Sequence, residues 1–465
     1  MHVLPPLYFM AFILLLGGIF VWMIYGFQRG KNLGKLMALV LCAVLAVTGI
    51  IGNQYLNSTK NTLDEISGEP IVKDHSIELY IYKDSTVSLD DPDQNLRIGV
   101  LKYQYRNYVN LAISQLRDIC SNLEIVECDT ALMMDNMLQS HQIDAMLMDS
   151  HMLSIMQDEA KHKNLEKDIR SIYTYEYIVN NEEVLKPVDV TNEPFTVLIS
   201  GSDSRKGIDE TARSDSNMLV TVNPKEKILL MVSIPRDYYV QIDCDATMGC
   251  AAGEYDKLTH TGLYGTEVTE MTIEHLLSVE INYHARVCFS TLVNVVDALG
   301  GISVSNETTF RDRYDKYTFE EGVNHLDGDM ALAYARERYA FASGDRQRGR
   351  NQMKVLSAIV RKAASPSIVT QYQDVLYAIS DTFTTNMSTD EMMALVNLQL
   401  QDHSSWRIYS FSMDGQGASM PSIEYGSDVS VIEPDSQAVT QVRKDIRAVK
   451  NGQTPPYLNK KEKEK

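Results

Sequence analysis

An uncharged stretch at the N-terminus limits, more than any other feature, what this chain can fold into. No charged side chain occurs from Val3 to Phe27, which is long enough to cross the roughly 30 Å hydrocarbon core of a bilayer as a helix. A second apolar run extends from Leu36 to Gly52. We therefore predict two membrane-spanning helices, residues 1–27 and 36–52. A cleaved signal peptide is the alternative, but such a peptide should begin with basic residues, and this chain begins without Lys or Arg.

The short loop between the two apolar runs predicts their orientation. Residues 28–35 carry Arg29, Lys31 and Lys35 and no acid. Short loops rich in Lys and Arg stay on the cytoplasmic side of a membrane. We therefore expect a cell-membrane protein whose chain after Gly52 forms extracytoplasmic domains.

Two pairs of neighbouring cysteines fit an extracytoplasmic location, where disulfides persist. Cys244 and Cys250 lie in a Gly-containing loop, which favours a disulfide between them. For Cys120 and Cys128, a disulfide and a pair of buried thiols remain open. None of the four has the paired spacing that is typical of a zinc site.

The charge balance narrows the class of partner. The chain carries 43 Lys and Arg against 62 Asp and Glu, a formal net charge of -19. Proteins that bind nucleic acids need a broad positive field. We therefore expect no nucleic-acid partner, and a small, densely charged anion fits the sequence better.

Alternating strand and helix patterns predict an α/β protein with two domains outside the membrane. Residues 53–75 are polar and read as a linker. Residues 76–187 alternate short apolar runs with helical patterns, which predicts a small α/β accessory domain with parallel strands. It contains no recognisable motif, so a ligand- or partner-binding module and a plain spacer stay open. Residues 190–450 form a second domain, and the Lys-rich tail 451–465 is predicted to be disordered.

Charged residues follow two strands predicted for the second domain. Phe195 to Ser200 is a buried-strand pattern, and Asp203 comes shortly after it. Lys227 to Ile234 is a nearly continuous apolar run, typical of a sheet covered on both faces, and Arg236 follows it. Ligands of open α/β sheets bind beyond the carboxyl ends of strands. Asp203 and Arg236 are therefore candidate site residues.

An arginine cluster between Met330 and Gln352 is the densest positive region of this acidic chain. A helix beginning at Asp345 would place Arg348 and Gln352 on one face, together with apolar core residues. A guanidinium aimed towards a core needs an anionic partner, and the first turn of a helix favours anions. The alternative is that these arginines are solvated or paired with nearby acids. The five arginines of the cluster are Arg336, Arg338, Arg346, Arg348 and Arg350.

Arg336 and Arg338 converge only if the preceding helix ends near Ala335, because residues two apart lie on opposite faces of a helix but on one face of an extended segment. Asp203 and Asp215 supply two carboxylates that suit a shared Mg²⁺ ion. Such acids and arginines, without His or Cys, indicate phosphoryl chemistry.

Five short motifs in order resemble the signature set of the LytR-CpsA-Psr (LCP) family. They are GSDSR at Gly201, RSDS at Arg213, SIPRD at Ser233, LDGDMALAYARER at Leu326 and DRQRGRNQ at Asp345. The resemblance covers roughly Phe195 to Ala364. It implies an α-β-α layered catalytic domain on a membrane-anchored enzyme that moves glycopolymers, such as teichoic acid or capsular polysaccharide, from an undecaprenyl-pyrophosphate carrier to peptidoglycan.

The resemblance also implies roles for individual residues. Asp203 and Asp215 would bind Mg²⁺, or Mn²⁺, together with the pyrophosphate, and either Asp237 or Asp215 would take the proton of the acceptor. Two departures from the family pattern are Thr259, where Asn is frequent, and Asn351, where Arg is usual. The residues implied to contact the pyrophosphate are Arg213, Arg236, Lys257, Arg336, Arg338, Arg348 and Gln352.

The expected reaction is attack by a peptidoglycan sugar hydroxyl on the phosphorus that bears the glycopolymer, which forms a phosphodiester link. Two other functions remain possible. One is a receptor that binds polyprenyl pyrophosphates without turnover. The other is a membrane-bound transcription attenuator, against which the outside topology and the acidity weigh.

Overall fold

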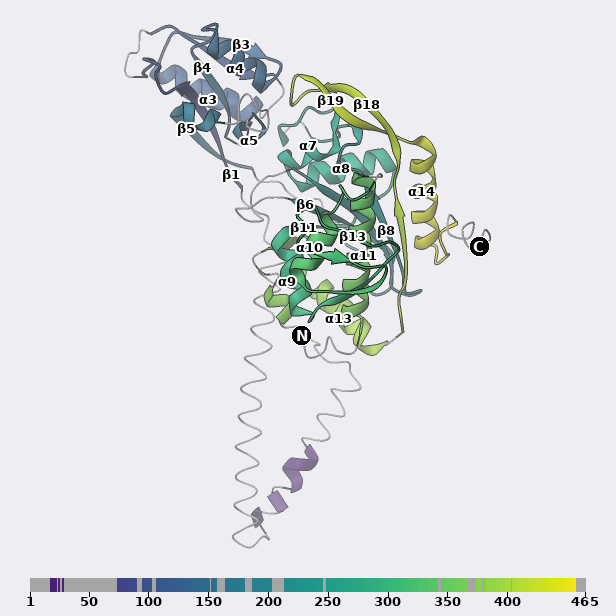
Figure 1. Ribbon diagram of the computed structural model, residues 1–465. Helices are drawn as coiled ribbons and strands as arrows, with labels where there is room; N and C mark the ends of the chain where they lie inside the picture. Colours follow the sequence, from purple (N-terminus) through teal and green to yellow (C-terminus); the bar gives the residue numbers. More distant parts are fainter. Residues whose placement is uncertain are drawn as a thin grey trace.

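The computed structural model shows a mixed α/β protein with two folded domains (Figure 1). No helix among the described residues is long and apolar enough to cross a membrane. The second predicted span, most of the first, Asp203 and the tail beyond residue 456 lie outside these residues. The structure describes residues 17–22, 24–25, 27–28, 73–89, 94–102, 106–150, 152–156, 164–179, 186–202, 213–245, 248–341, 344–365, 374–378, 380, 382–402 and 404–456.

The accessory domain is a five-stranded sheet in the order β3-β2-β4-β1-β5. Strands β2, β3 and β4 are parallel, as predicted, but β1 runs antiparallel to both of its neighbours. The sequence reading missed β5, whose register pairs Val179 with Lys73 and so brings the entry and the exit of the domain together. The strands are β1 (Lys73–Tyr82), β2 (Leu96–Leu101), β3 (Leu123–Cys128), β4 (Ala145–Asp149) and β5 (Ile169–Val179).

The helices of the accessory domain connect its strands. Thr130 caps α4, because its side chain accepts a hydrogen bond from the Met133 amide. Cys120 and Cys128 are buried free thiols, which settles the alternative left open by the sequence. The helices are α3 (Arg106–Ile119), α4 (Ala131–Gln139), α5 (Met152–Met156) and α6 (Leu165–Asp168).

The second domain is built on a six-stranded mixed sheet in the order β16-β11-β6-β7-β8-β17. Every residue of β8 is buried, as its apolar run predicts. Successive side chains of a strand point to opposite faces, so Leu230 and Met231 belong to different cores. The strands are β6 (Phe195–Ser202), β7 (Ser216–Asn223), β8 (Ile228–Ile234), β11 (Tyr283–Cys288), β16 (Phe383–Thr385) and β17 (Arg407–Ser412).

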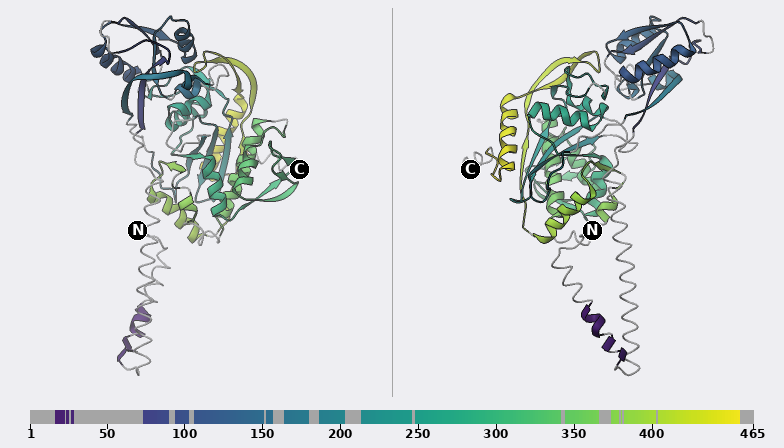
Figure 2. Two further views of the ribbon diagram at one scale, coloured as in Figure 1. Left: turned by 60° about the vertical axis from the view of Figure 1, so that its left-hand side comes forward. Right: turned by 180° about the vertical axis from the view of Figure 1, so that it is seen from behind.

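Helices cover both faces of this sheet, which gives the α-β-α layering (Figures 1 and 2). Leu230 packs in a cluster with α8 (Thr266–Leu277) and α14 (Ser436–Lys450). Met231 packs on the other face with α11 (Asp345–Ala363) and α13 (Thr389–Gln401). Residues 451–456, assigned to a disordered tail, instead continue from α14, where the Gln453 amide donates to the Ala448 carbonyl.

Smaller elements complete the domain and frame the ends of the central strands. Tyr334 and Phe319 belong to a separate apolar cluster beneath α10. These elements are β9 (Tyr239–Gln241), β10 (Tyr255–Lys257), α7 (Leu258–Thr261), η2 (Gly262–Tyr264), α9 (Phe289–Ala298), β12 (Ile302–Asn306), β13 (Phe310–Arg311), β14 (Thr318–Phe319), β15 (Gly322–Leu326), α10 (Gly328–Arg336), β18 (Gly415–Ser422) and β19 (Ser427–Pro434).

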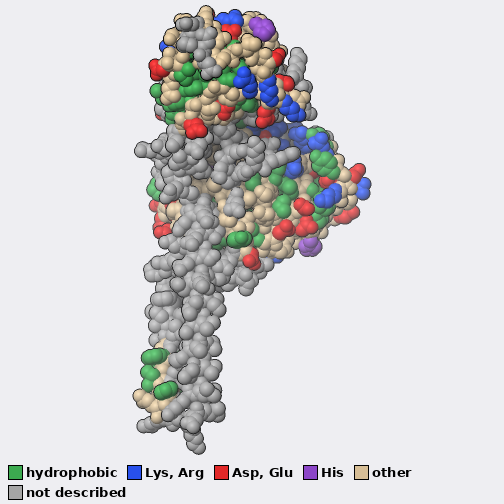
Figure 3. All heavy atoms as spheres, turned by 90° about the vertical axis from the view of Figure 1, so that its left-hand side faces the viewer, with side chains coloured by type: hydrophobic (Ala, Val, Ile, Leu, Met, Phe, Trp, Pro, Cys, Tyr) green, Lys and Arg blue, Asp and Glu red, His purple; other side chains and the backbone are tan. Residues whose placement is uncertain are grey.

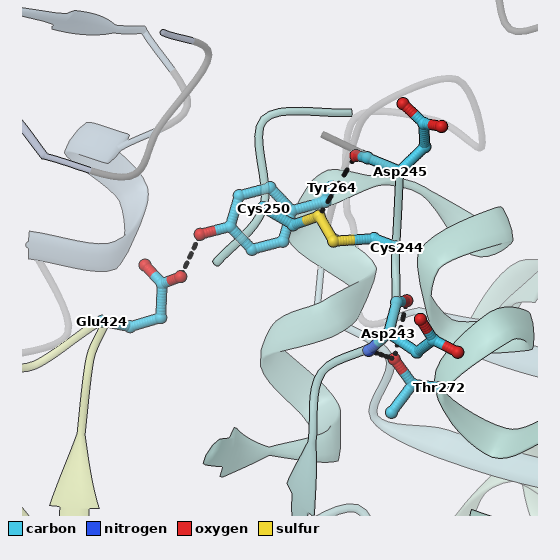
Figure 4. Close-up of a disulfide and its surroundings, with 7 residues drawn as sticks. All are labelled: Asp243, Cys244, Asp245, Cys250, Tyr264, Thr272 and Glu424. Carbon is cyan, nitrogen blue, oxygen red and sulfur yellow. Dashed lines mark hydrogen bonds between the residues drawn. A yellow bond between two sulfur atoms is a disulfide. The ribbon is translucent and has the colours of Figure 1, made fainter. Parts of the chain in front are cut away.

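A disulfide joins Cys244 to Cys250, which confirms the sequence prediction (Figure 4). Both cysteines, together with Tyr264, belong to the apolar cluster that also contains the core of the accessory domain. The disulfide loop is therefore part of the contact between the two domains.

Candidate anion-binding site

Three strand ends and the first turns of one helix meet around an opening on the protein surface. The strands β8 and β17 are parallel, so their carboxyl ends lie at the same edge of the sheet, where the antiparallel β7 begins. Helix α11 starts above this edge. The lining residues are Asp215, Ser216, Asn217, Ser233, Ile234, Pro235, Arg236, Arg346, Arg348, Gly349, Gln352 and Ser412.

Gly349 lets the helix approach the sheet at this point. A β-carbon at position 349 would collide with the Ser233 hydroxyl at the end of β8. An alanine here would force the Ser233 side chain to shift, so Gly349 permits the close packing of α11 on β8 that brings Arg348 to the opening. The sequence does not indicate this role, because a glycine inside a helical pattern ordinarily only lowers the stability of the helix.

A row of alternating charges runs along one side of the opening. Arg236 Nη1 donates to Asp215 Oδ1 at 2.5 Å, and Arg236 Nε lies 3.8 Å from Asp237 Oδ2. Lys257 Nζ donates to the other oxygen of Asp237 at 3.2 Å. The Arg236 and Asp215 side chains are only 26% and 16% exposed. These contacts hold the Arg236 guanidinium in one orientation before any ligand arrives.

Arg348 and Gln352 line the opposite side, as their spacing on one helix face predicts. Arg348 Nη2 donates to the Asp215 carbonyl at 3.5 Å. Gln352 Oε1 accepts a hydrogen bond from Ser216 Oγ at 2.9 Å. The first turns of α11 and the start of β7 are therefore joined by two polar contacts at the opening.

The other arginines of this helix behave differently from one another. Arg346, which the sequence reading left as a solvated residue, lines the opening and is paired with Asp414 at 2.7 Å. Arg350 is exposed and donates to Gln347 at 3.2 Å. Asn351 is fully buried, and its Nδ2 donates to the Tyr334 carbonyl at 3.1 Å. Asn351, which stands where the family usually has Arg, therefore joins α11 to α10 and does not line the opening.

Besides Asp237, four other predicted residues lie outside the lining of the opening. Helix α10 ends at Arg336, as the prediction requires, but the Arg336 guanidinium stacks over the Phe289 ring at 4.3 Å. Arg338 donates to the Tyr339 hydroxyl at 2.5 Å. The remaining two are Arg213 and Lys257, whose partners are Tyr425 and Asp237.

Buried Glu337 separates Arg336 from Arg338 and organises the loop between them. Its carboxylate accepts hydrogen bonds from the amides of Arg313, Tyr339 and Ala340. The Arg336 guanidinium lies over the partly buried Phe289 ring and that of Arg338 over the exposed Tyr339 ring.

Oxygen ligands dominate the Asp215 side of the opening and suit a hard cation such as Mg²⁺. Asp215 and Ser216 supply a carboxylate and a hydroxyl there. Within the described part of the chain, no three His, Cys, Asp or Glu side chains form a metal-binding group. Strand β6 ends at Ser202, and Gly201 of this strand pairs with Ser216 of β7. In the sequence, Asp203 directly follows β6 and Asp215 directly precedes β7.

Sequence reasoning missed the serines at the strand ends. Ser233 and Ser412 lie at the carboxyl ends of the adjacent parallel strands β8 and β17 and line the opening. A usable signal was present for Ser233, which begins the SIPRD motif. Ser412 had none, because only the pairing of β17 with β8 brings it to the site.

Comparison with known proteins identifies the family to which the sequence is similar. The model of the LytR_cpsA_psr family matches residues 150–447, most of the chain. The chain is 34% identical over 278 residues to a polyisoprenyl-teichoic acid–peptidoglycan teichoic acid transferase TagU of Enterococcus faecalis, covering 59% of this chain and 85% of the relative. It is 37% identical over 232 residues to the protein of the same name from Bacillus cereus, covering 50% and 69%.

A solved structure, that of B. subtilis TagV, is 29% identical to the chain, with a TM-score of 0.46 and coverage of 57% of this chain and 99% of TagV. The family match spans the five sequence motifs and begins at residue 150, within the accessory domain. The family model matches more than half of the chain, and together with the TagU relatives this match confirms the resemblance. The chain belongs to the LytR-CpsA-Psr family.

Proposed function

We propose that this protein transfers a glycopolymer from an undecaprenyl-pyrophosphate carrier to a sugar hydroxyl of peptidoglycan, with formation of a phosphodiester. The observation that carries the proposal is the opening itself. Arg236, Arg346 and Arg348 converge there at the strand ends of a strongly acidic chain. The relatives named as teichoic acid transferases support the same reaction class.

The arrangement suits a pyrophosphate because its donors come from rigid elements. Arg236 follows a fully buried strand and is held by two carboxylates. Arg348 comes from the first turn of a long helix, whose N-terminus also favours negative charge. Fixed donors stabilise the charge that develops in a transition state without a reorganisation cost.

In the reaction, the acceptor hydroxyl attacks the phosphorus that bears the glycopolymer, and a new P–O bond forms. The bond from that phosphorus to the bridging oxygen breaks, and undecaprenyl phosphate leaves. Asp215 or Asp237 takes the hydroxyl proton. Arg348 and Arg236 neutralise the charge on the departing phosphate.

Asp215, with Asp203 as its expected partner, would hold a Mg²⁺ ion, for which Mn²⁺ is the alternative. When bound, such an ion supplies additional neutralisation of the phosphate oxygens. The Arg236 side chain already balances the Asp215 charge, so binding of a cation at Asp215 would need this ion pair to loosen.

We further propose that the two N-terminal helices anchor the enzyme in the cell membrane with both folded domains outside. Residues 17–22 are helical, and large apolar side chains on this segment are exposed, including Phe20 at 59% and Trp22 at 57%. Exposed apolar side chains of this size are typical of a surface that contacts lipid or another apolar partner. Thiol labelling of cysteines placed in the 28–35 loop tests the topology, since the loop should be protected in intact cells.

The test of the proposed function is a transfer assay with the full chain in lipid nanodiscs. It receives a labelled saccharide on a polyprenyl pyrophosphate, Mg²⁺ and peptidoglycan oligomers. We expect the label to become covalently attached to the oligomers. A saccharide that binds tightly but is neither transferred nor hydrolysed would show a receptor and overturn the transferase.

A further inference from the structure

The tip of the β18–β19 hairpin lies between the accessory domain and the catalytic domain (Figures 1 and 2). On the accessory side, Gly426 packs directly on Thr130, the cap of α4, so closely that a β-carbon at position 426 would collide with the threonine side chain. An opening of about 270 Å³ beside this contact is lined by residues of both domains, including Ala131 and Glu424. The hairpin tip is therefore in contact with the accessory domain.

On the catalytic side, the fully buried Asp256 holds the same tip. Asp256 Oδ2 accepts hydrogen bonds from Ser422 Oγ at 3.0 Å and from the Glu424 amide at 3.1 Å. Asp256 Oδ1 accepts from the Lys257 amide at 2.7 Å and lies 3.0 Å from His260 Nδ1. One buried carboxylate thus connects the hairpin tip to the segment that carries Lys257.

A third contact comes from Glu424, whose carboxylate accepts a hydrogen bond from the Tyr264 hydroxyl (Figure 4). Tyr264 belongs to the apolar cluster shared with the accessory domain. The tip is therefore held from both domains over a span of a few residues.

Tyr425, between Glu424 and Gly426, faces the candidate site residue Arg213. Its hydroxyl accepts a hydrogen bond from Arg213 Nη2 at 2.5 Å, and its ring lies 5.8 Å from the guanidinium carbon. The other neighbour of the ring is His260, at 5.4 Å between ring centres. Figure 3 shows Lys and Arg side chains gathered where the two domains meet.

The segment that carries Arg213 is also tied to the anion-binding opening. The Ser214 amide donates to the Thr259 carbonyl at 3.0 Å, and the Thr259 amide donates to the Arg236 carbonyl at 2.9 Å. Asp215, two residues after Arg213, lines the opening. These hydrogen bonds fix the backbone next to Arg213 at the edge of the site. A shift of the hairpin tip would therefore move the guanidinium group of Arg213 while its backbone stays in place.

From these contacts we propose that Tyr425 is a positioning residue for the transfer reaction, and that the accessory domain takes part by holding the hairpin tip. Tyr425 holds the Arg213 guanidinium beside the segment that leads to Asp215 at the opening, and we expect Arg213, a pyrophosphate contact implied by the family resemblance, to reach the donor from this position. This inference rests on the proposed function, and it gives the accessory domain a role beyond that of a spacer.

The test compares Tyr425→Phe with the wild-type full chain in nanodiscs. Phenylalanine keeps the ring against His260 and removes only the hydroxyl that Arg213 contacts. Hydrogen bonds to charged groups are among the stronger ones, so we expect the Kd for the polyprenyl-pyrophosphate donor to rise about tenfold. The KM for peptidoglycan oligomers and the melting temperature should stay unchanged.

A double-mutant cycle with Arg213→Ala separates positioning from a purely structural role. If Tyr425 acts through Arg213, Tyr425→Phe adds no further loss of donor affinity in the Arg213→Ala background. Losses that multiply, or a Tyr425→Phe variant with unchanged donor affinity, would overturn the inference. A wild-type chain that binds the donor without transferring it would instead overturn the proposed function, and one that binds no donor would overturn both.

Gly426→Ala tests whether the accessory domain helps to position Arg213, because the added methyl group pushes the hairpin tip away from Thr130. Its matched control is Gly322→Ala, since Gly322 also has a positive φ but nothing within 4 Å of an added β-carbon. We expect Gly426→Ala to weaken donor binding several-fold and Gly322→Ala to leave it unchanged. Equal effects of the two variants would show that the accessory contact does not position Arg213.

Discussion

Arg236 Nη1 and Asp215 Oδ1 lie 2.5 Å apart at the edge of the central sheet, one from the end of β8 and the other from the start of β7. The pair compensates two partly buried charges and fixes the direction of the guanidinium. Three arginines and one carboxylate line the opening around it. Arg346 at the same opening is paired with Asp414, so acids balance part of the positive charge and also fix the directions of two of the three guanidinium groups.

Arg348→Ala should remove transferase activity and leave the fold intact. The side chain lies at the opening, and its Nη2 donates a long hydrogen bond of 3.5 Å to the Asp215 carbonyl. Loss of one fixed donor to a developing charge costs about 100-fold to 1,000-fold in rate. The transfer assay and a thermal melt measure the two effects. Arg350→Ala, an exposed arginine of the same helix, is the matched control and should transfer at the wild-type rate.

The parts of the site that were predictable from sequence depend on local spacing. Arg348 and Gln352 share a helix face because they are one turn apart, and Arg236 follows a strand that its apolar run identifies. Both patterns can be read within about ten residues. The apolar run of β8 indicates a sheet covered on both faces, and the α-β-α layering itself is what the family resemblance implies.

The parts that could not be predicted depend on contacts between distant segments. Arg213 meets Tyr425 across a sequence separation of 212 residues, and nothing near either residue indicates the other. The contacts of Arg336 with the Phe289 ring and of buried Glu337 with the Arg313 amide likewise join distant segments, while the phosphate contacts of Arg336 and Arg338 stay a prediction. The missed strand β5 is stabilised by pairing with β1, for which its own polar and aromatic sequence is a weak signal.

Gly349→Ala should destabilise the protein and reduce transfer, although alanine favours helices over glycine by about 1 kcal/mol. The added methyl group meets the Ser233 hydroxyl at the end of β8, and overpacking of this kind costs about 1–3 kcal/mol. The steric effect therefore outweighs the gain in helix propensity. Urea unfolding measures the net change in the free energy of unfolding.

Removal of the hydroxyl provides the control for this collision. Ser233→Ala combined with Gly349→Ala should recover most of the lost stability, because the nearest atom is then absent. If the single variant Gly349→Ala is as stable as the wild type, then α11 does not approach β8 as closely as described.

Loss of the Cys244–Cys250 disulfide should lower the free energy of unfolding by about 2 kcal/mol, the amount expected for a short loop. The loop packs in the cluster shared with the accessory domain, so reduction should also loosen the contact between the domains. Thermal melts with and without reductant measure the change. A variant with Cys244→Ser and Cys250→Ser is the control, since its melting temperature should not respond to reductant. A wild-type melt that is equally insensitive would mean that the bond contributes nothing.

Glu424→Gln should make stability less dependent on pH. Burial, followed by the nearby Asp256 charge, raises the pKa of Glu424 from its usual 4.5 to about 7. Between these two pH values the unfolded chain releases the proton and the folded chain keeps it, so the wild type loses stability as the pH rises from about 4.5 to about 7. Above that range the loss is complete. It amounts to at most about 3 kcal/mol, from 1.36 kcal/mol per pKa unit.

The glutamine side chain does not ionise, and its oxygen can still accept the hydrogen bond from Tyr264. The stability of Glu424→Gln relative to the wild type should therefore increase from pH 4.5 to pH 7.5 in urea unfolding experiments. Asp428→Asn, which alters an exposed carboxylate on the same hairpin, is the matched control and should follow the wild-type profile. A constant difference between Glu424→Gln and the wild type across this range would show that Glu424 is already ionised in the folded protein at pH 4.5. The hydrogen bond from the Tyr264 hydroxyl would then be made to a charged carboxylate at every pH tested.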